Sequence, residues 1–209
     1  MVFDLDGTLT REANSWAALQ RELGPEHHGR ARDRWSRYRQ GLLTREEFLH
    51  EQVADLAGGD AALLDRVVDA VEYHDGVAAT CAALRGAGIG MAIVSAGISV
   101  LSERVAHDLG IELHHANRIH VDDGRITGLA DITVPPGGKA PVFREVIAHF
   151  GCRADEVVAV GDSSGDIDMF RIAGLGVAFC PASWEAQEAA DVVIEVPDMR
   201  HLLPLVLTR

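Results

Sequence analysis

Two carboxylates stand two positions apart near the start of the chain, in the segment Asp4-Leu5-Asp6-Gly7-Thr8. A short apolar run precedes them. Because alternate residues of an extended segment share a face, both acids are predicted to leave a strand on the same side, and Gly7 then allows a sharp turn. Two carboxylates this close repel each other unless one is protonated or a cation lies between them. The pair therefore indicates a metal site, a reaction centre, or both.

Further polar residues end short β-like runs later in the chain. Ser95 closes the run that begins at residue 90, and Asp162 closes the run that begins at 156, with Asp166 shortly after it. Open parallel sheets gather their ligands at the carboxyl ends of their strands. We therefore expect Asp4, Ser95 and Asp162 to lie together at one edge of a sheet.

Lys139 is the single lysine of the sequence, since all other basic side chains except histidine are arginines. A general need for positive charge would be met here by arginine. An ammonium is a compact point charge, whereas a guanidinium is a planar fork. The sequence thus indicates that the point charge is the property that matters at position 139.

Composition excludes several classes of partner. The chain has 209 residues, of which 47% are hydrophobic and 24% charged, and its formal net charge is −13. That charge disfavours nucleic acid or an acidic membrane surface, because both require a basic protein surface. No apolar run approaches the length of a membrane span and no signal segment is recognised, so we expect a cytoplasmic protein. The oligomeric state is left open.

The hydrophobic pattern divides the chain into two parts. Residues 14–74 have helical spacing throughout, with a capping box at Thr44 to Glu47 and a break at Gly58-Gly59. Residues 1–13 and 75–209 are predicted to form the core domain, and 14–74 a small helical cap domain inserted into it. In the core, helices alternate with short Val/Ile/Ala strands, which is typical of a parallel sheet covered on both faces. The predicted fold is α/β, a Rossmann-like three-layer α/β/α core with the inserted cap.

The predicted core elements can be given by their residue ranges. They are helices at 76–86, 98–109, 139–150, 165–173, 183–189 and 198–206, strands at 90–95, 156–161, 175–179 and 191–195, and a β excursion at 112–134 with a hairpin turn at Asp122-Asp123-Gly124.

Four segments in order resemble the haloacid dehalogenase superfamily of phosphohydrolases. They are FDLDGT, the Ser95 of IVSAG, Lys139, and GDSSGDID. Within the superfamily the chain is most similar to the phosphoserine phosphatase group, whose pattern is matched by HANRIHVDDGRITG, GVAFC and AADVVIE. The resemblance covers essentially the whole chain and implies a phosphoric monoester hydrolase.

The resemblance also implies roles for the core residues. Asp4 would attack phosphorus to form an aspartyl-phosphate, and Asp6 would move the protons of the leaving group and of the attacking water. Ser95, the backbone N–H of Ala96, and Lys139 would bind the phosphate, and Thr8 would orient the loop. The implied cofactor is Mg²⁺, a hard cation suited to oxygen ligands. Its implied ligands are the Asp4 carboxylate, the Asp6 carbonyl and Asp162. Asp166 would be either a further ligand or a residue that hydrogen-bonds to the ligands.

The cap departs from the group's pattern at the substrate positions. Gln52 stands where an arginine for the serine carboxylate is expected, and Arg39 and Arg45 stand where the group has apolar residues. Between residues 30 and 45 six arginines face one acid, a local charge of +5 by 6 minus 1. A solvated helix face is one interpretation of this run. The other is that Arg39, Arg45 and Gln52 contact a second anionic or polyhydroxylated part of the substrate.

The function that follows is Mg²⁺-dependent hydrolysis of a small phosphorylated metabolite. Phosphoserine phosphatase activity proper is an alternative, and so is a phosphotransferase or phosphomutase using the same aspartyl-phosphate.

The tryptophans Trp16 and Trp35 are predicted to belong to the core of the cap and not to a substrate surface.

Overall fold

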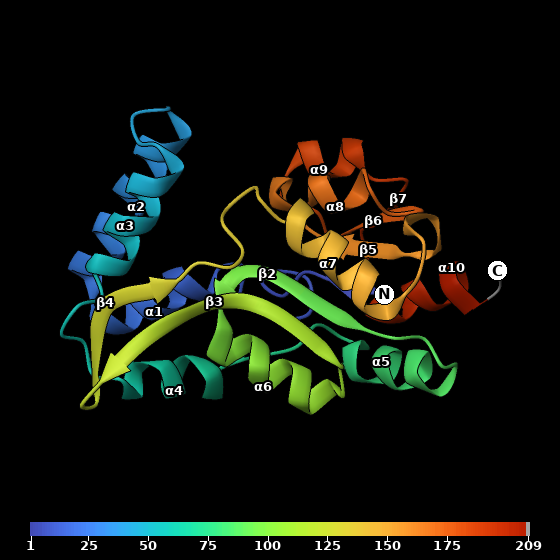
Figure 1. Cartoon of the computed structure of the whole chain (residues 1–209), viewed down its shortest axis with the longest axis horizontal. Helices are drawn as coiled ribbons and strands as arrows, with labels where there is room; N and C mark the ends of the chain where they lie inside the picture. Colours follow the sequence, from blue (N-terminus) through green and yellow to red (C-terminus); the bar gives the residue numbers. More distant parts are fainter. Residues whose placement is uncertain (208–209) are drawn as a thin grey trace.

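A seven-stranded sheet organises the chain in the computed structural model, which describes residues 1–207 (Figure 1). The strand order is β4-β3-β2-β1-β5-β6-β7. Neighbouring strands are parallel except for the antiparallel pair β3 and β4. The strands are β1 (Val2–Phe3), β2 (Ala92–Ile98), β3 (Leu113–Asp122), β4 (Arg125–Asp131), β5 (Val158–Gly161), β6 (Leu175–Phe179) and β7 (Val192–Ile194).

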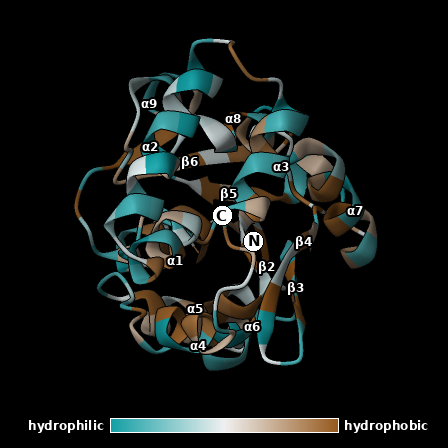
Figure 2. Ribbon diagram, turned by 90° about the vertical axis from the view of Figure 1, so that its left-hand side faces the viewer, coloured by the Kyte–Doolittle hydropathy of each residue, from teal (hydrophilic) through white to brown (hydrophobic). Residues whose placement is uncertain are grey.

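Helices cover both faces of the sheet, and alternate strand residues point into the two layers. Phe3 and Ile93 belong to one buried cluster, which includes side chains of α5 (Val77–Gly86) and α6 (Ser99–Leu109). Val2 and Ala92 belong to the other, with side chains of α7 (Ala140–Phe150), α8 (Ile167–Phe170) and α9 (Trp184–Ala189). Strands buried on both faces are near-continuous apolar runs, and Figure 2 shows hydrophobic colours along the central strands and mixed hydrophilic and hydrophobic colours along the helices outside them. The predicted three-layer α/β fold is confirmed.

Four helices lie between β1 and α5. They are α1 (Ser15–Leu23), α2 (Pro25–Arg39), α3 (Arg45–Ala54) and α4 (Ala62–Asp69). Side chains of α1 and α4, including Trp16, Leu19 and Leu63, belong to the same buried cluster as the core strands. The pair α2 and α3 projects away from the sheet (Figure 1). The division at residues 14–74 stays a prediction.

Most local predictions agree with the structure to within a few residues. Thr44 and Glu47 form the capping box of α3. Asp123 and Gly124 both have positive φ, 44° and 71°, as the predicted hairpin turn requires. The predicted helix at 165–173 is shorter: a 3-10 turn at Ser164–Asp166 leads into α8, because the Asp166 side chain accepts backbone N–H groups of the loop before it.

The remaining short elements complete the chain. They are the 3-10 helices Ala154–Glu156 and Met199–Leu202 and the helix α10 (Leu203–Leu207). Within the part of the chain that the structure describes, no helix is both long enough and apolar enough to cross a membrane.

Candidate active site

The sheet brings three predicted residues to one edge. The strands β2, β1 and β5 are neighbours, Asp4 follows β1, Asp162 follows β5, and Ser95 lies in the middle of β2, which continues beyond the predicted end at residue 95. Lys139 immediately precedes α7. These four residues line one cavity of about 460 Å³. The sequence prediction that Asp4, Ser95 and Asp162 lie together at one edge of the sheet is thus confirmed in space.

Lys139 is held between two carboxylates. Its Nζ lies 2.7 Å from Asp4 Oδ1 and 2.7 Å from Asp166 Oδ1, and only 4% of its side chain is exposed. Burial opposes the charge, but Asp166 and Asp4 hold the pKa of Lys139 above its usual value. An ammonium reaches both oxygens from one point, which a planar guanidinium cannot reproduce.

Asp166 orders the loop as well as the lysine. Its Oδ2 accepts hydrogen bonds from the backbone N–H groups of Asp162, at 3.1 Å, and Ser163, at 2.9 Å. A Cβ at Gly161 would overlap the Asp166 side chain. The carboxylate is fully buried, and both its oxygens have hydrogen-bond partners. The sequence left two roles open for Asp166, a metal ligand or a residue that orients the ligands, and this geometry suits the orienting role.

The carboxylates of Asp4, Asp162 and Asp166 offer a set of hard ligands. One oxygen from each lies within 4.8 Å of the others. Burial raises the pKa of Asp4 well above its ordinary value, and burial together with the Asp166 charge raises that of Asp162 to about 7. A divalent cation would offset this cost of burying several negative charges together. Oxygen donors of this kind fit Mg²⁺ and not a soft metal.

Asp6 lines the same cavity, but its carboxylate is engaged elsewhere. Its Oδ2 accepts hydrogen bonds from the backbone N–H and from Oγ of Ser15, each at 2.7 Å. Its Oδ1 is buried and has no hydrogen-bond partner among residues 1–207. Burial raises the pKa of Asp6 to about 6, which suits proton transfer near neutral pH. A metal contact through the Asp6 carbonyl stays a prediction.

Ser15 contacts Asp6 in the structure, and the sequence did not reveal this contact. It begins α1, and its Oγ also accepts the N–H of Ile98 at 3.2 Å, so it joins the first inserted helix to β2 and to Asp6. A Cβ on Gly97 would lie 2.5 Å from Ser15 Oγ and 2.9 Å from Asp6 Oδ2. No motif marks this serine, because Asn14 is the residue that caps the helix.

The expected phosphate-binding groups surround Asp4. Ser95 Oγ accepts the N–H of Gly97 at 3.0 Å. Ala96 lines the cavity, and its carbonyl accepts the Nε1–H of Trp16 at 2.9 Å, which fixes the orientation of this peptide.

Thr8 lies in the turn that follows Asp4 and Asp6. Its Oγ1 donates to Asp162 Oδ1 at 3.4 Å. Gly7 has a φ of +78°, and a Cβ there would lie 2.6 Å from Asp162 Oδ2. The turn after Asp6 therefore needs glycine for its backbone conformation and for the close approach of Asp162.

The three cap residues proposed from sequence are not all brought to the site. Arg39 and Gln52 line the cavity of Asp4. Arg45 lines a separate cavity, between α3 and β4, and its Nη2 donates to the Gly137 carbonyl at 3.4 Å. Its contact with substrate stays a prediction that this arrangement does not favour.

The arginine run is largely neutralised by the next helix. Arg30 and Arg34 contact Asp55, at 2.7 Å and 3.1 Å, and Arg37 contacts Glu51 at 3.0 Å. The charge of +5 counted over residues 30–45 therefore does not describe the surface of the folded protein. The acids that balance it, Glu51 and Asp55, come after residue 45 in the sequence. Arg39 has no carboxylate within 4.0 Å among residues 1–207.

The prediction for Trp35 is also wrong. Its side chain is 48% exposed and lines the cavity, together with Tyr38 and Phe48. Trp16 is 5% exposed and packs in the core, as predicted, although its edge also reaches the cavity wall. The periodicity placed Trp35 on the apolar face of a helix, but its ring contacts Tyr38 and Phe48 and otherwise borders the cavity.

Comparisons with known proteins agree with this site. Residues 1–171 match the haloacid dehalogenase-like hydrolases. A phosphoserine phosphatase of Methanocaldococcus jannaschii is 29% identical over 204 residues, covering 97% of this chain and 95% of that protein. One from Streptomyces coelicolor is 36% identical over 166 residues, 79% of this chain, but the match spans only 40% of that longer protein.

A solved structure described as a phospho-aspartyl intermediate analogue of phosphoserine phosphatase superposes with a TM-score of 0.86 and 28% identity, covering 98% of this chain and 97% of the other. The family match, the fold and the order of the motifs along the strands lead to the same assignment. The chain belongs to the haloacid dehalogenase-like hydrolase family.

Proposed function

We propose that the protein is a Mg²⁺-dependent phosphomonoester hydrolase that acts on a small phosphorylated metabolite through an aspartyl-phosphate. One observation carries the proposal: the Asp4 carboxylate is held 2.7 Å from Lys139 in a cavity that also contains Ser95 and Asp162. Phosphoryl transfer needs positioning and charge stabilisation above all, and this arrangement supplies a nucleophile and a cation together.

The reaction has two steps. An oxygen of Asp4 forms a bond to phosphorus as the bond to the leaving oxygen breaks, and Asp6 gives its proton to that oxygen. Water then attacks the phosphorus of the aspartyl-phosphate, and Asp6 takes a proton from this water. The bond between phosphorus and the Asp4 oxygen breaks, which regenerates the Asp4 carboxylate and releases inorganic phosphate. The pKa of Asp6, raised to about 6 by burial, lets one carboxyl act as acid and then as base.

The other residues bind and orient the phosphoryl group. Ser95 Oγ and the backbone N–H of Ala96 donate to its oxygens, and Lys139 neutralises it. Mg²⁺ would be held by Asp4, Asp162 and the Asp6 carbonyl, where it would supply further charge neutralisation. We assign Asp166 the orienting role, because its oxygens are taken by Lys139 and by the loop.

The natural substrate is proposed to differ from phosphoserine. The relatives and the solved structure named above are phosphoserine phosphatases, yet Gln52 lines the cavity where the group's carboxylate-binding arginine is expected. A charge-assisted hydrogen bond worth about 1.5–3 kcal/mol would then be missing. Phosphoserine phosphatase activity proper is the second candidate, and the names of the relatives favour it.

Phosphate release by the purified protein tests the proposal. With Mg²⁺ present, inorganic phosphate should appear from 4-nitrophenyl phosphate and from members of a panel of phosphorylated metabolites, and a chelator should stop the release. Adding alcohol acceptors separates hydrolysis from phosphoryl transfer. Release that is no faster with the wild type than with Asp4→Asn would contradict the proposal.

A further inference from the structure

Three aromatic side chains form one surface on the cap side of the active-site cavity, here called the aromatic shelf. Trp35 and Tyr38 come from α2 and Phe48 from α3. The Tyr38 and Phe48 rings stack with centroids 4.8 Å apart and 29° between their planes, and Trp35 lies 5.7 Å from each of them. All three line the cavity that contains Asp4.

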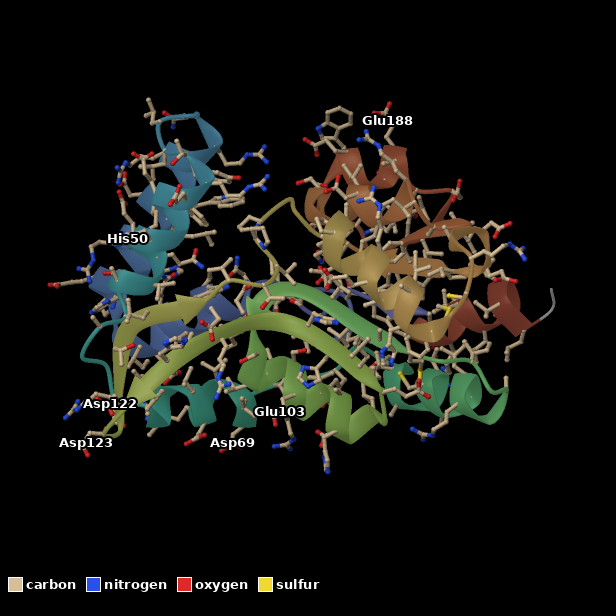
Figure 3. All side chains as sticks on the ribbon, viewed as in Figure 1. His50, Asp69, Glu103, Asp122, Asp123 and Glu188 are labelled. Carbon is tan, nitrogen blue, oxygen red and sulfur yellow. The ribbon has the colours of Figure 1, made fainter. Side chains whose placement is uncertain are left out.

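The exposed fraction of the side chain differs strongly between Phe48 and Trp35, although both belong to the same aromatic shelf. Phe48 is 5% exposed and joins α3 to α2, whereas 48% of Trp35 remains exposed. An exposed tryptophan in a cavity wall offers a large apolar face whose coverage by a ligand is favourable. The side chains of α2 and α3 extend into the space in front of the loop before α7, while His50 lies on the outer side of the pair (Figure 3).

Polar groups at the shelf also lack partners. Trp35, Tyr38 and Arg39 share one face of α2 by helical spacing, and Arg39 is the only charged side chain that the cap contributes to this cavity among residues 1–207. Gln52, one turn after Phe48, is 7% exposed and its amide has no hydrogen-bond partner in the same part of the chain. The amide is not one of the fully buried polar groups without a partner in this part of the chain, so it is accessible from the cavity, where a ligand can form a hydrogen bond with it.

The cavity is continuous from the nucleophile to the shelf. Asp4, Lys139 and Ser95 of the core and Trp35 and Arg39 of α2 line a single volume of about 460 Å³. Cavities of this size accept a phosphate together with one moderate organic group. A molecule whose phosphate reaches Asp4 therefore places its leaving group against the shelf.

We infer that the substrate's leaving group carries a planar aromatic or heteroaromatic ring that stacks on the aromatic shelf, with an anionic substituent near Arg39. This inference rests on the proposed phosphomonoester hydrolase activity and names the substrate class. The exposed face of the Trp35 ring is flat and suits stacking by a flat ring. Arg39 excludes a quaternary ammonium group, the other ligand that aromatic surfaces bind well, because like charges repel.

A pair of matched esters tests the ring in the wild-type protein. Benzyl phosphate and cyclohexylmethyl phosphate have the same carbon skeleton and release a primary alcohol, but only the first ring is flat. We expect kcat/KM to be about tenfold higher for benzyl phosphate. Equal values, or a higher value for phosphocholine than for benzyl phosphate, would overturn the inference.

Variants with matched controls locate the effect. Trp35→Leu should reduce the benzyl preference to about twofold or less, Trp35→Phe should retain most of it, and glycerol 3-phosphate, which has no ring, should be hydrolysed at nearly the wild-type rate by both. Trp184→Leu is the control, because Trp184 is 67% exposed on α9 and does not line the cavity. A benzyl preference unchanged by Trp35→Leu would contradict the shelf as its cause.

A carboxylate on the ring tests Arg39. 4-Carboxybenzyl phosphate should exceed benzyl phosphate about tenfold in kcat/KM for the wild type. Arg39→Ala should abolish this difference, and Arg32→Ala, an exposed arginine of the same helix that lies outside the cavity, should preserve it. Loss of the difference in both variants would refute a specific contact.

Failure of the inference can be told apart from failure of the proposed function. If glycerol 3-phosphate and benzyl phosphate both release phosphate but show no ring preference, only the inference is wrong. If none of the esters releases phosphate in the presence of Mg²⁺, the hydrolase proposal is wrong and the inference falls with it.

Discussion

The Nζ atom of Lys139 lies 2.7 Å from Oδ1 of Asp4, and only 4% and 8% of these two side chains are exposed. Asp4 Oδ1 also accepts the backbone N–H of Leu5 at 2.6 Å. The proposed nucleophile is therefore fixed by two donors on one oxygen. Because the pair is buried, the loss of either partner leaves an uncompensated charge in the protein.

Replacing Lys139 by arginine should cause a severe loss of activity although the charge is retained. The planar fork cannot occupy the point between Asp4 and Asp166 that the ammonium holds. We expect kcat to fall by about a hundredfold or more, measured as phosphate release from 4-nitrophenyl phosphate. An arginine variant with wild-type kinetics would refute the importance of the point charge.

Asp4→Asn should abolish phosphate release while the fold is retained. The amide has nearly the same shape as the carboxylate but is a much weaker nucleophile. A fluoride–metal mimic of the phosphoryl group, soaked into crystals of the wild type, should place its central atom in line with an Asp4 oxygen. Turnover by pure Asp4→Asn protein at the wild-type rate would exclude the aspartyl-phosphate.

Asp162→Ala should raise the Mg²⁺ concentration needed for half-maximal activity. The variant loses one of the three carboxylates whose oxygens lie within 4.8 Å of one another, and a hard cation depends on such ligands. The measurement is a Mg²⁺ titration of activity after chelator treatment. Asp168→Ala serves as the control, because Asp168 lies in α8 outside this cluster and should leave the titration unchanged.

Metal-free protein should lose stability as the pH rises. The pKa values of Asp6 and Asp162 are raised by burial to about 6 and about 7, above the value of about 4 for an unfolded aspartate. Between about pH 4 and 7 the folded protein thus binds more protons than the unfolded chain, and the free energy of unfolding falls with rising pH. In chelator, Tm should be higher near pH 5 than at pH 8 by a few degrees, and Mg²⁺ should restore it at pH 8.

A variant isolates this effect from other titrating groups. His74 and His115 have lowered pKa values because they are partly buried. The folded protein therefore binds fewer protons at these histidines than the unfolded chain does, and their contribution to the free energy of unfolding increases as the pH rises. Asp162→Asn keeps both histidines and should show a smaller decrease of Tm between pH 5 and 8. The same decrease in the variant as in the wild type would assign it to other groups.

Phosphoserine should be a poor substrate of the wild type, and Gln52→Arg should improve it. The guanidinium would restore a charge-assisted contact with the serine carboxylate worth about 1.5–3 kcal/mol, or roughly ten- to a hundredfold in kcat/KM. 4-Nitrophenyl phosphate, which has no carboxylate, should change little. Efficient hydrolysis of phosphoserine by the wild type would instead support the plain phosphoserine phosphatase assignment.

The sequence by itself determined the sheet, the order of its elements along the chain and which polar residues meet at one edge of the sheet. Asp4, Ser95 and Asp162 follow apolar runs, and parallel strands bring their carboxyl ends to one edge, so local pattern and topology together placed them. Turn and cap residues such as Thr44 and Gly124 were also readable, because backbone conformation at these positions depends mainly on neighbouring residues.

The tertiary structure alone decided which side chains of the inserted helices reach the substrate cavity. Arg37 pairs with Glu51 of the next helix, Arg45 turns to the Gly137 carbonyl, and Trp35 remains exposed beside the cavity. Helical spacing assigns a residue to a face, but the partner of that face depends on how α2 and α3 pack against each other and against the core. Such contacts join residues distant in sequence, and side-chain periodicity carries no information about them.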